Sequence, residues 1–110
     1  SPLARGLLTR DPAAPTARQE TDEFGKTLYG TADRGVIQAV ADIAAERGVS
    51  RAQVALAWVS KHPAVSAPIV GATKPHHLDD ALASLDIRLT DDEVRRLEAP
   101  YTPQPVQGFI

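Results

Sequence analysis

The first third of the chain shows no regular pattern of hydrophobic positions. Residues 10–30 carry prolines, charges, threonines and glycines, with an apolar period of neither 2 nor 3.6. Such a composition is typical of disorder, although Phe24, Leu28 and Tyr29 indicate that the far end packs on something. Long structureless loops are uncommon inside compact domains, and those that occur are often functional lids. Disorder and a functional loop both stay open for this segment.

From residue 31 the pattern becomes helical, and two helices are predicted over residues 31–61. In the first helix, Thr31 is a plausible N-cap and Gly48 a plausible C-terminal stop. Its polar residues fall on one side. The apolar positions that share the other side are Val36, Ile37, Val40, Ile43 and Ala44.

The second predicted helix begins at a capping box. Ser50 and Gln53 have the spacing at which each side chain binds the other residue's backbone N–H. Residues 54–59 are apolar on nearly every side, so this helix needs cover on more than one face, and Trp58 is expected in the core. His62-Pro63 ends it.

The next stretch, VSAPIVGATKPHHL at 65–78, predicts a buried strand that passes directly into a helix. The strand is expected over 65–71 and the helix over 75–85, with Pro75 in its first turn. Leu78, Ala81, Leu82 and Leu85 give this helix one apolar face. A last helix over 90–99 opens with a capping box from Thr90 to Glu93 and directs Val94 and Leu97 inward. Residues 100–110 are too rich in proline for a helix or a central strand.

This order of elements is unusual for a complete domain. One predicted strand cannot form a sheet, because its backbone N–H and C=O groups need partners. Residues 1–6, SPLARG, read as a loop with no strand before it. We therefore expect the chain to be the last part of a larger protein.

Composition removes several classes of function. The chain has 110 residues, a formal charge of −2 and no cysteine, so neither nucleic acid nor an anionic membrane is an expected partner, and thiolate chemistry is excluded. No apolar run approaches the roughly 18 residues of a membrane span, and the N-terminus lacks the apolar core of a signal peptide. No histidine has a partner at metal-ligand spacing, so no metal site is expected. A cytoplasmic protein is the default expectation from these absences.

The residues around 71–77 have the chemistry of a phosphate site. Gly71 allows close backbone approach, Thr73 offers a hydroxyl, and the start of the following helix presents N–H groups. Lys74 adds a positive charge, and His77 is a further potential donor one turn on. The structural alternative is that Thr73 only caps the helix and that Lys74 is solvated.

Several segments together resemble one family. The stretches SPLARGLL, ETDEFGKTLYG, RAQVALAWV, PIVGATKPHHLDDAL, LTDDEV and PYTPQPVQGF follow one another as in the C-terminal part of bacterial aldo/keto reductases. The branch they resemble includes relatives of potassium-channel β-subunits. The resemblance implies an α/β fold, namely about the last two βα units of a (β/α)8 barrel. In isolation such a chain should be mostly helical, with at most one or two short strands.

The resemblance also implies an NADP(H) cofactor and a carbonyl substrate. Residues 1–9 would follow the seventh strand, with the first of them along the pyrophosphate, and residues 10–30 would cover the cofactor. Residues 65–71 would be the eighth strand, and 71–74 would receive the adenosine 2′-phosphate. Ala81 departs from the asparagine of many relatives, while Arg5, Arg18 and Lys26 are either phosphate contacts or solvated charges. The positions that match the family's cofactor site are Ser1, Pro2, Leu3, Gly6, Gly71, Ala72, Thr73, Lys74, His77 and Asp80, the last expected on the adenine amino group.

The resemblance assigns no catalytic residue to this chain. In the family, the catalytic tyrosine and its aspartate, lysine and histidine lie before the seventh strand, so neither Tyr29 nor Tyr101 takes that role. The parent protein is therefore expected to be an NADPH-dependent reductase of aldehydes and ketones, and this chain alone to be inactive. A nucleotide-sensing protein or a protein-interaction module without catalysis is the alternative. We also expect the isolated chain to self-associate through apolar faces that lack barrel neighbours.

Overall fold

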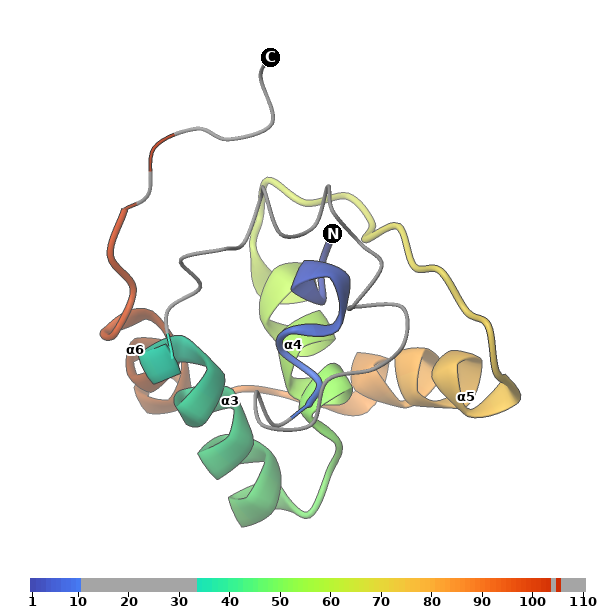
Figure 1. Cartoon of the computed structure of the whole chain (residues 1–110), viewed down its shortest axis with the longest axis horizontal. Coiled ribbons are helices and arrows are strands. Elements are labelled where there is room, and N and C mark those ends of the chain that lie inside the picture. Colours follow the sequence, from blue (N-terminus) through green and yellow to red (C-terminus); the bar gives the residue numbers. More distant parts are fainter. Residues whose placement is uncertain (11–33, 104, 106–110) are drawn as a thin grey trace.

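The computed structural model describes residues 1–10, 34–103 and 105. The predictions for residues 11–33, including Arg18, Lys26, Tyr29 and the Thr31 cap, and for the end of the tail lie outside the described residues. The described part is mostly helical, as expected (Figure 1). Its elements are η1 (Ala4–Gly6), α3 (Arg34–Arg47), α4 (Arg51–Lys61), α5 (Pro75–Ala83), η2 (Ser84–Asp86) and α6 (Asp91–Glu98).

Helix α3 ends as its sequence predicts. Gly48 adopts a left-handed φ of 67°, which a glycine reaches without steric cost. The Gly48 N–H donates to the Ala45 carbonyl at 3.2 Å, and the Val49 N–H donates to the Ala44 carbonyl at 3.0 Å. This pair of bonds satisfies carbonyls that a helix end would otherwise leave open, and it turns the chain sharply toward α4.

Helix α4 begins at the predicted capping box. The Gln53 N–H donates to Ser50 Oγ at 3.1 Å, and the Ser50 N–H donates to Gln53 Oε1 at 3.0 Å. The expectation that Trp58 is buried in the core is wrong, because its side chain is 36% exposed. The indole N–H needs a hydrogen-bond partner, and it finds one near the surface in the Glu98 carboxylate at 3.1 Å.

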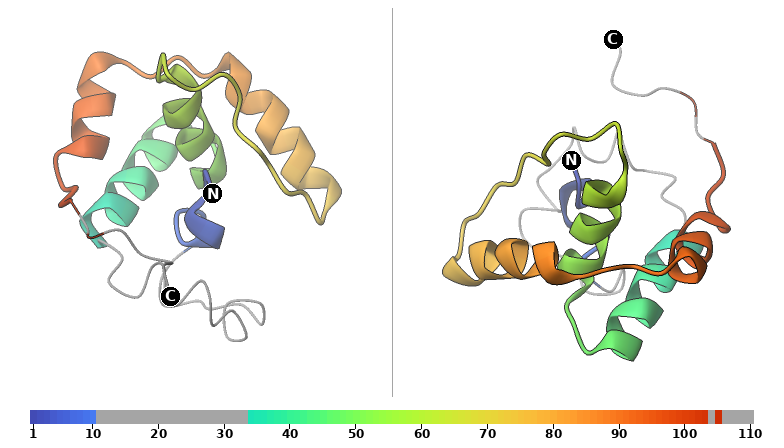
Figure 2. Two further views of the ribbon diagram at one scale, coloured as in Figure 1. Left: turned by 90° about the horizontal axis from the view of Figure 1, so that it is seen from above. Right: turned by 180° about the vertical axis from the view of Figure 1, so that it is seen from behind.

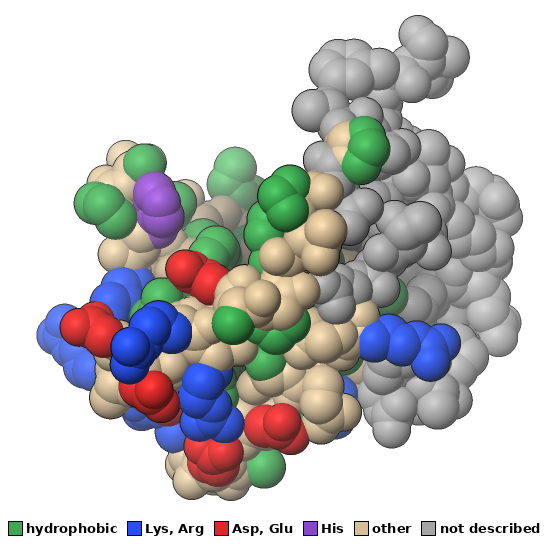
Figure 3. Space-filling model, turned by 90° about the vertical axis from the view of Figure 1, so that its left-hand side faces the viewer, with side chains coloured by type: hydrophobic (Ala, Val, Ile, Leu, Met, Phe, Trp, Pro, Cys, Tyr) green, Lys and Arg blue, Asp and Glu red, His purple; other side chains and the backbone are tan. Residues whose placement is uncertain are grey.

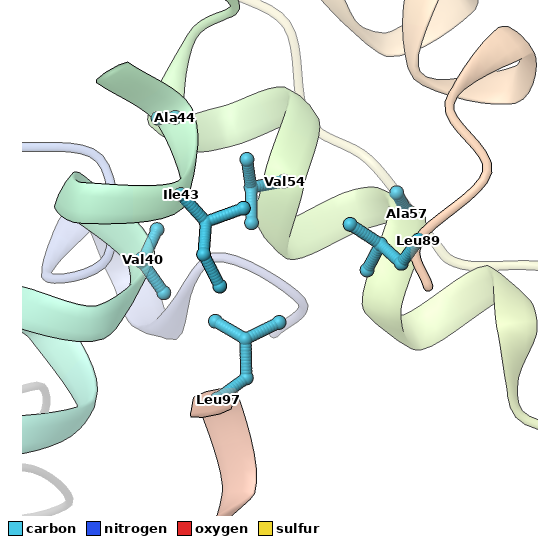
Figure 4. Packing of buried hydrophobic residues seen from close by; sticks show 7 residues of the cluster. All are labelled: Val40, Ile43, Ala44, Val54, Ala57, Leu89 and Leu97. Carbon is cyan, nitrogen blue, oxygen red and sulfur yellow. The ribbon is translucent and has the colours of Figure 1, made fainter. Parts of the chain in front are cut away.

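The core forms where α3, α4 and α6 meet. Figure 4 shows apolar side chains from α3 and α4 converging on Leu97 of α6, with Leu89 entering from the segment before α6. The predicted inner faces of these helices are thereby confirmed. The cluster consists of Val40, Ile43, Ala44, Val54, Ala57, Leu89 and Leu97.

Two arginine–glutamate pairs join α3 to α6. Arg47 of α3 donates to both carboxylate oxygens of Glu93, at 2.6 and 2.5 Å, and also to the Arg88 carbonyl at 2.7 Å. Arg96 of α6 donates to both oxygens of Glu46, at 2.8 and 2.7 Å. Glu93 also completes the predicted capping box by accepting the Thr90 N–H at 2.9 Å. Charged side chains of both signs are interspersed on this side of the molecule (Figure 3).

The segment predicted as a strand, 65–71, runs from α4 to α5 as extended chain without sheet pairing (Figure 1). A strand needs a neighbour to bind its backbone groups, and the described residues offer none. Its place as the eighth strand of a barrel stays a prediction. Ile69 in this segment is 90% exposed.

Helix α5 begins at Pro75 as predicted, but it ends at Ala83 and continues as the tighter turn η2. Its apolar face is exposed: Leu78 is 55%, Leu82 58% and Leu85 67% accessible. None of the helices among the described residues is long and apolar enough to cross a membrane.

Candidate functional site

The predicted phosphate loop lies at the free end of α5. Figures 1 and 2 show the segment before α5 reaching the far end of that helix, while α4 crosses near its other end. Gly71, Ala72, Thr73 and Lys74 are all exposed there. This loop is therefore accessible to a ligand.

Helix α5 begins without a side-chain cap. Lys74 is the N-cap residue, with extended backbone (φ −136°, ψ 150°), and its side chain makes no capping hydrogen bond. The part of the structural alternative in which Thr73 caps the helix is therefore wrong, whereas its other part, a solvated Lys74, agrees with the exposure of that side chain. In this first turn Pro75 has no N–H and the His77 backbone N–H donates to the Lys74 carbonyl, so His76 is the remaining source of a backbone N–H. The partial positive charge of a helix start favours an anion there.

His77 folds back onto the loop that precedes its own helix. The Nδ1 atom of its ring accepts the Thr73 backbone N–H at 3.3 Å and lies 3.5 Å from Thr73 Oγ1. The backbone N–H of His77 donates to the Lys74 carbonyl at 3.0 Å. Sequence reasoning expected His77 as a donor, and the structure uses Nδ1 as an acceptor. Nε2 is then the nitrogen that carries the proton in the neutral ring. His76 stands edge-on to His77, with ring centroids 4.5 Å apart.

Few contacts within the described chain fix the positions of Gly71 and Asp80, compared with those of Thr73 and His77. A Cβ added to Gly71 would meet nothing within 4 Å, so any need for glycine there must come from a ligand or another part of the protein. Asp80 is half-buried one turn beyond His77, and its backbone carbonyl accepts the Ser84 N–H at the end of α5. The expected contact of its carboxylate with adenine stays a prediction.

The N-terminal candidates form a tight turn. Ala4 and Arg5 have left-handed backbone with φ of 50° and 54°, and Gly6 follows at 95°. Such conformations are uncommon for residues with a Cβ and tend to occur at ligand sites. The N–H groups of residues 4 and 6–9 nevertheless all donate to carbonyls inside the turn, so backbone donors for a pyrophosphate are not exposed there.

Sequence reasoning overlooked Arg10 beside this turn. A Cβ added to Gly6 would lie 2.0 Å from Arg10 Nη2, so the guanidinium covers the glycine. The available signal was the spacing of Arg10, a basic residue four positions after Gly6 in a loop. That spacing alone does not show that the chain turns back and brings the two residues together. Arg10 adds a cation to the candidate site.

The structure does not bring the two groups of candidates together. Ser1, Pro2, Leu3 and Gly6 lie beside α4, whereas the loop at 71–74 lies at the far end of α5 (Figures 1 and 2). A small anion could contact only one of the two groups. An elongated ligand with phosphates at separate positions would suit both.

The groups with perturbed pKa values lie outside these segments. Hydrogen bonds from Arg47 lower the pKa of Glu93 to about 2, and Glu93 in turn raises the pKa of Arg47. Arg96 lowers the pKa of Glu46 in the same way. These shifts belong to the pairs between α3 and α6 and mark a structural network rather than a proton-transfer site. Among the described residues, no group of three or more metal-binding side chains comes together.

The model of the Aldo/keto reductase family matches residues 1–101. The chain belongs to the aldo/keto reductase family. It is 42% identical, over its whole length, to the candidate aryl-alcohol dehydrogenase C750.01 of Schizosaccharomyces pombe. Over 96% of its length it is 37% identical to the versiconal hemiacetal acetate reductase of Aspergillus parasiticus. These matches cover 34% and 32% of the two relatives, so the chain spans about a third of their length.

Membership of the aldo/keto reductase family confirms the expected resemblance and agrees with the mostly helical fold. Both relatives named above are fungal, and they do not single out a bacterial origin or the channel-associated branch. Those two narrower expectations stay predictions. The cofactor-binding residues expected from the resemblance likewise stay predictions.

Proposed function

We propose that this chain supplies part of the NADP(H) site of a protein that reduces aldehydes or ketones to alcohols. The observation that carries the proposal is the loop at 71–74, which leads into the uncapped start of α5 in a chain of this family. NADPH, when bound, supplies the hydride. The relatives named as an aryl-alcohol dehydrogenase and a hemiacetal acetate reductase agree with small alcohol or carbonyl substrates.

The roles of this chain's residues are binding and orientation. Lys74 and the His76 N–H at the start of α5 would attract the 2′-phosphate, because a full positive charge and a helix N-terminus both favour a dianion. Thr73 would add its hydroxyl, and Asp80 would accept from the adenine amino group. Arg10, which lies against Gly6 beside the turn at residues 1–6, would contact the pyrophosphate through its guanidinium, because the backbone N–H groups of residues 4 and 6–9 already donate to carbonyls within that turn. We assign no catalytic residue here, so the chain alone is proposed to be inactive.

A protein-interaction role without catalysis is the second candidate. The exposed leucines at 78, 82 and 85 support it, because single exposed leucines are ordinary but an aligned set is not. The two candidates differ in their response to nucleotide. Only the cofactor-site proposal requires a binding energy that depends on the 2′-phosphate.

The test is a titration with NADPH and NADH in parallel. It is performed on the chain and on a chimera in which the chain replaces the corresponding third of C750.01, a relative with 42% identity. We expect tighter binding of NADPH, weakened about tenfold by Lys74→Ala, as expected for loss of a charge-assisted hydrogen bond. Arg95→Ala is the matched control, since it removes an exposed charge on α6 that is 77% accessible. Equal affinity for both nucleotides, or equal effects of the two variants, would refute the site.

A further inference from the structure

The segment that joins α4 to α5 leaves its backbone groups without partners in the described chain (Figure 1). Backbone hydrogen bonds stop at the Val65 N–H and resume at the Thr73 N–H, and none is found among the described residues for 66–72. Ile69 is 90% exposed and Val70 37%, so the segment lies at the surface. Exposed extended chain with unpaired N–H and C=O groups offers a second chain an edge to pair with.

The two edges of this segment differ. In extended chain, the N–H and C=O groups of successive residues point toward opposite edges. Pro68 has no N–H, so the edge formed by the even-numbered residues is interrupted. Residues 67, 69 and 71 present a complete row of N–H and C=O groups on the other edge, which we call the open edge. A partner strand can therefore form a full ladder on the open edge alone.

We propose that two copies of the chain pair through the open edge, antiparallel and centred on Ile69. In this register Ile69 lies opposite the same residue of the second copy, and Ala67 lies opposite Gly71. Each of these pairs exchanges two hydrogen bonds. The interface is isologous, because the same edge serves both copies. Since the edge that contains Pro68 cannot add a further strand with a complete ladder, association ends at a dimer.

Charge and side chains favour a second copy as the partner. Residues 63–73 carry no charge, so like charges do not repel each other across the paired strands. The β-branched side chain of Ile69 meets its own copy, and such cross-strand apolar pairs stabilise sheets. Two short strands alone are only marginally stable, so the dimer is expected to be weak. The exposed leucines of α5 provide further apolar surface to bury. This pairing does not depend on the proposed cofactor site.

Proline substitutions at two neighbouring positions distinguish the edges. Ile69→Pro removes an N–H from the open edge, whereas Val70→Pro removes an N–H from the edge that Pro68 already interrupts. Both positions are exposed and make no backbone hydrogen bond in the described structure, so neither variant breaks a bond within one copy. Ile69→Ala is the side-chain control, because it shortens the side chain and keeps the N–H.

The experiment is sedimentation equilibrium of the full chain over a range of concentrations, with far-UV circular dichroism to compare the helix content of the variants. We expect a monomer–dimer equilibrium whose Kd rises at least about tenfold in Ile69→Pro, because the symmetric pair loses two hydrogen bonds, and less than about threefold in Val70→Pro. Ile69→Ala should weaken the dimer less than Ile69→Pro does. In the dimer, amide hydrogen exchange should be slowed at residues 67, 69 and 71 relative to 66, 70 and 72.

Four results would overturn the proposal. One is a chain that stays monomeric up to about 1 mM, since even a weak specific interface associates at that concentration. Another is a species larger than a dimer, which the interrupted edge does not allow. Equal effects of the two proline variants, or of Ile69→Ala and Ile69→Pro, would show that the open edge does not carry the pairing. Amide exchange that is equal on the two edges would show the same without any substitution.

Discussion

Replacing Glu93 with glutamine should lower the stability of the fold by an amount that depends on pH. Glu93→Gln keeps the capping box, because glutamine can still accept the Thr90 N–H. It removes the charge that pairs with Arg47. The variant therefore isolates the ion pair from the cap.

The magnitude follows from the pKa of the carboxyl group. Hydrogen bonds from Arg47, with smaller contributions from the Thr90 backbone and side chain, lower this pKa from 4.5 to about 2. Each pKa unit corresponds to about 1.4 kcal/mol, so roughly 3 kcal/mol is an upper limit for the contribution of the ion pair. The side chains of Arg47 and Glu93 are 28% and 12% exposed, so water screens part of this energy. We expect a loss of about 1–2 kcal/mol at pH 7, or roughly 5–15 °C in Tm for a chain of this size.

The pH dependence has a definite sign. Because the folded carboxyl has the lower pKa, the unfolded chain takes up the proton first as the pH falls. The stabilisation is complete above about pH 4.5 and is lost as the pH falls toward 2. The difference in Tm between the unchanged protein and Glu93→Gln should therefore shrink across this window.

The assay is thermal and urea unfolding followed by far-UV circular dichroism at pH 7, 4 and 3. Glu46→Gln is the control, because it breaks a second arginine fork between the same two helices. That pair is more exposed, at 38% and 55%, so its loss should matter much less. An equal loss in both variants, or a Glu93→Gln difference that does not change with pH, would refute the assignment of the stabilisation to this ion pair.

Two further predictions concern backbone and surface. Gly48→Ala should cost about 1 kcal/mol, measured by urea unfolding, because φ is 67° and the open space there leaves only the conformational term. Gly71→Ala, at a position with equally open surroundings and no left-handed φ, should have little effect on the same measurement. Leu82→Asp should reduce the self-association of the isolated chain in light scattering while leaving its helix content unchanged, because Leu82 is 58% exposed. A monodisperse monomer before substitution would contradict the expected self-association.

Sequence reasoning was most successful where local chemistry decides the structure. Both capping boxes and the turn at Gly48 were predictable, because each depends on neighbours within a few residues. The inner face of α3 followed from its helical period. Trp58 was misplaced because periodicity cannot show that an indole N–H will find a carboxylate forty residues away, on α6.

The candidate site was predictable in composition but not in geometry. Residue types and spacing indicated a phosphate loop at 71–74, and the structure places it at an accessible helix start. The reversed role of His77 could not be foreseen, because whether Nδ1 accepts or donates depends on how the loop turns before α5. The covering of Gly6 by Arg10 likewise requires the fold of the turn.

The distribution of exposed apolar side chains indicates how the site depends on the rest of an aldo/keto reductase. Helices α3, α4 and α6 share a closed core, whereas Ile69 before the loop and the leucines of α5 after it are exposed. The loop at 71–74 is therefore held between two segments that the described chain does not cover. A protein surface that packs on Ile69 and on the leucines of α5 would restrict the motion of the loop. Such packing should then raise the affinity for the cofactor, and cofactor binding should strengthen the packing. NADPH should accordingly bind more weakly to the chain alone than to the chimera, and equal affinities would mean that the loop needs no such support.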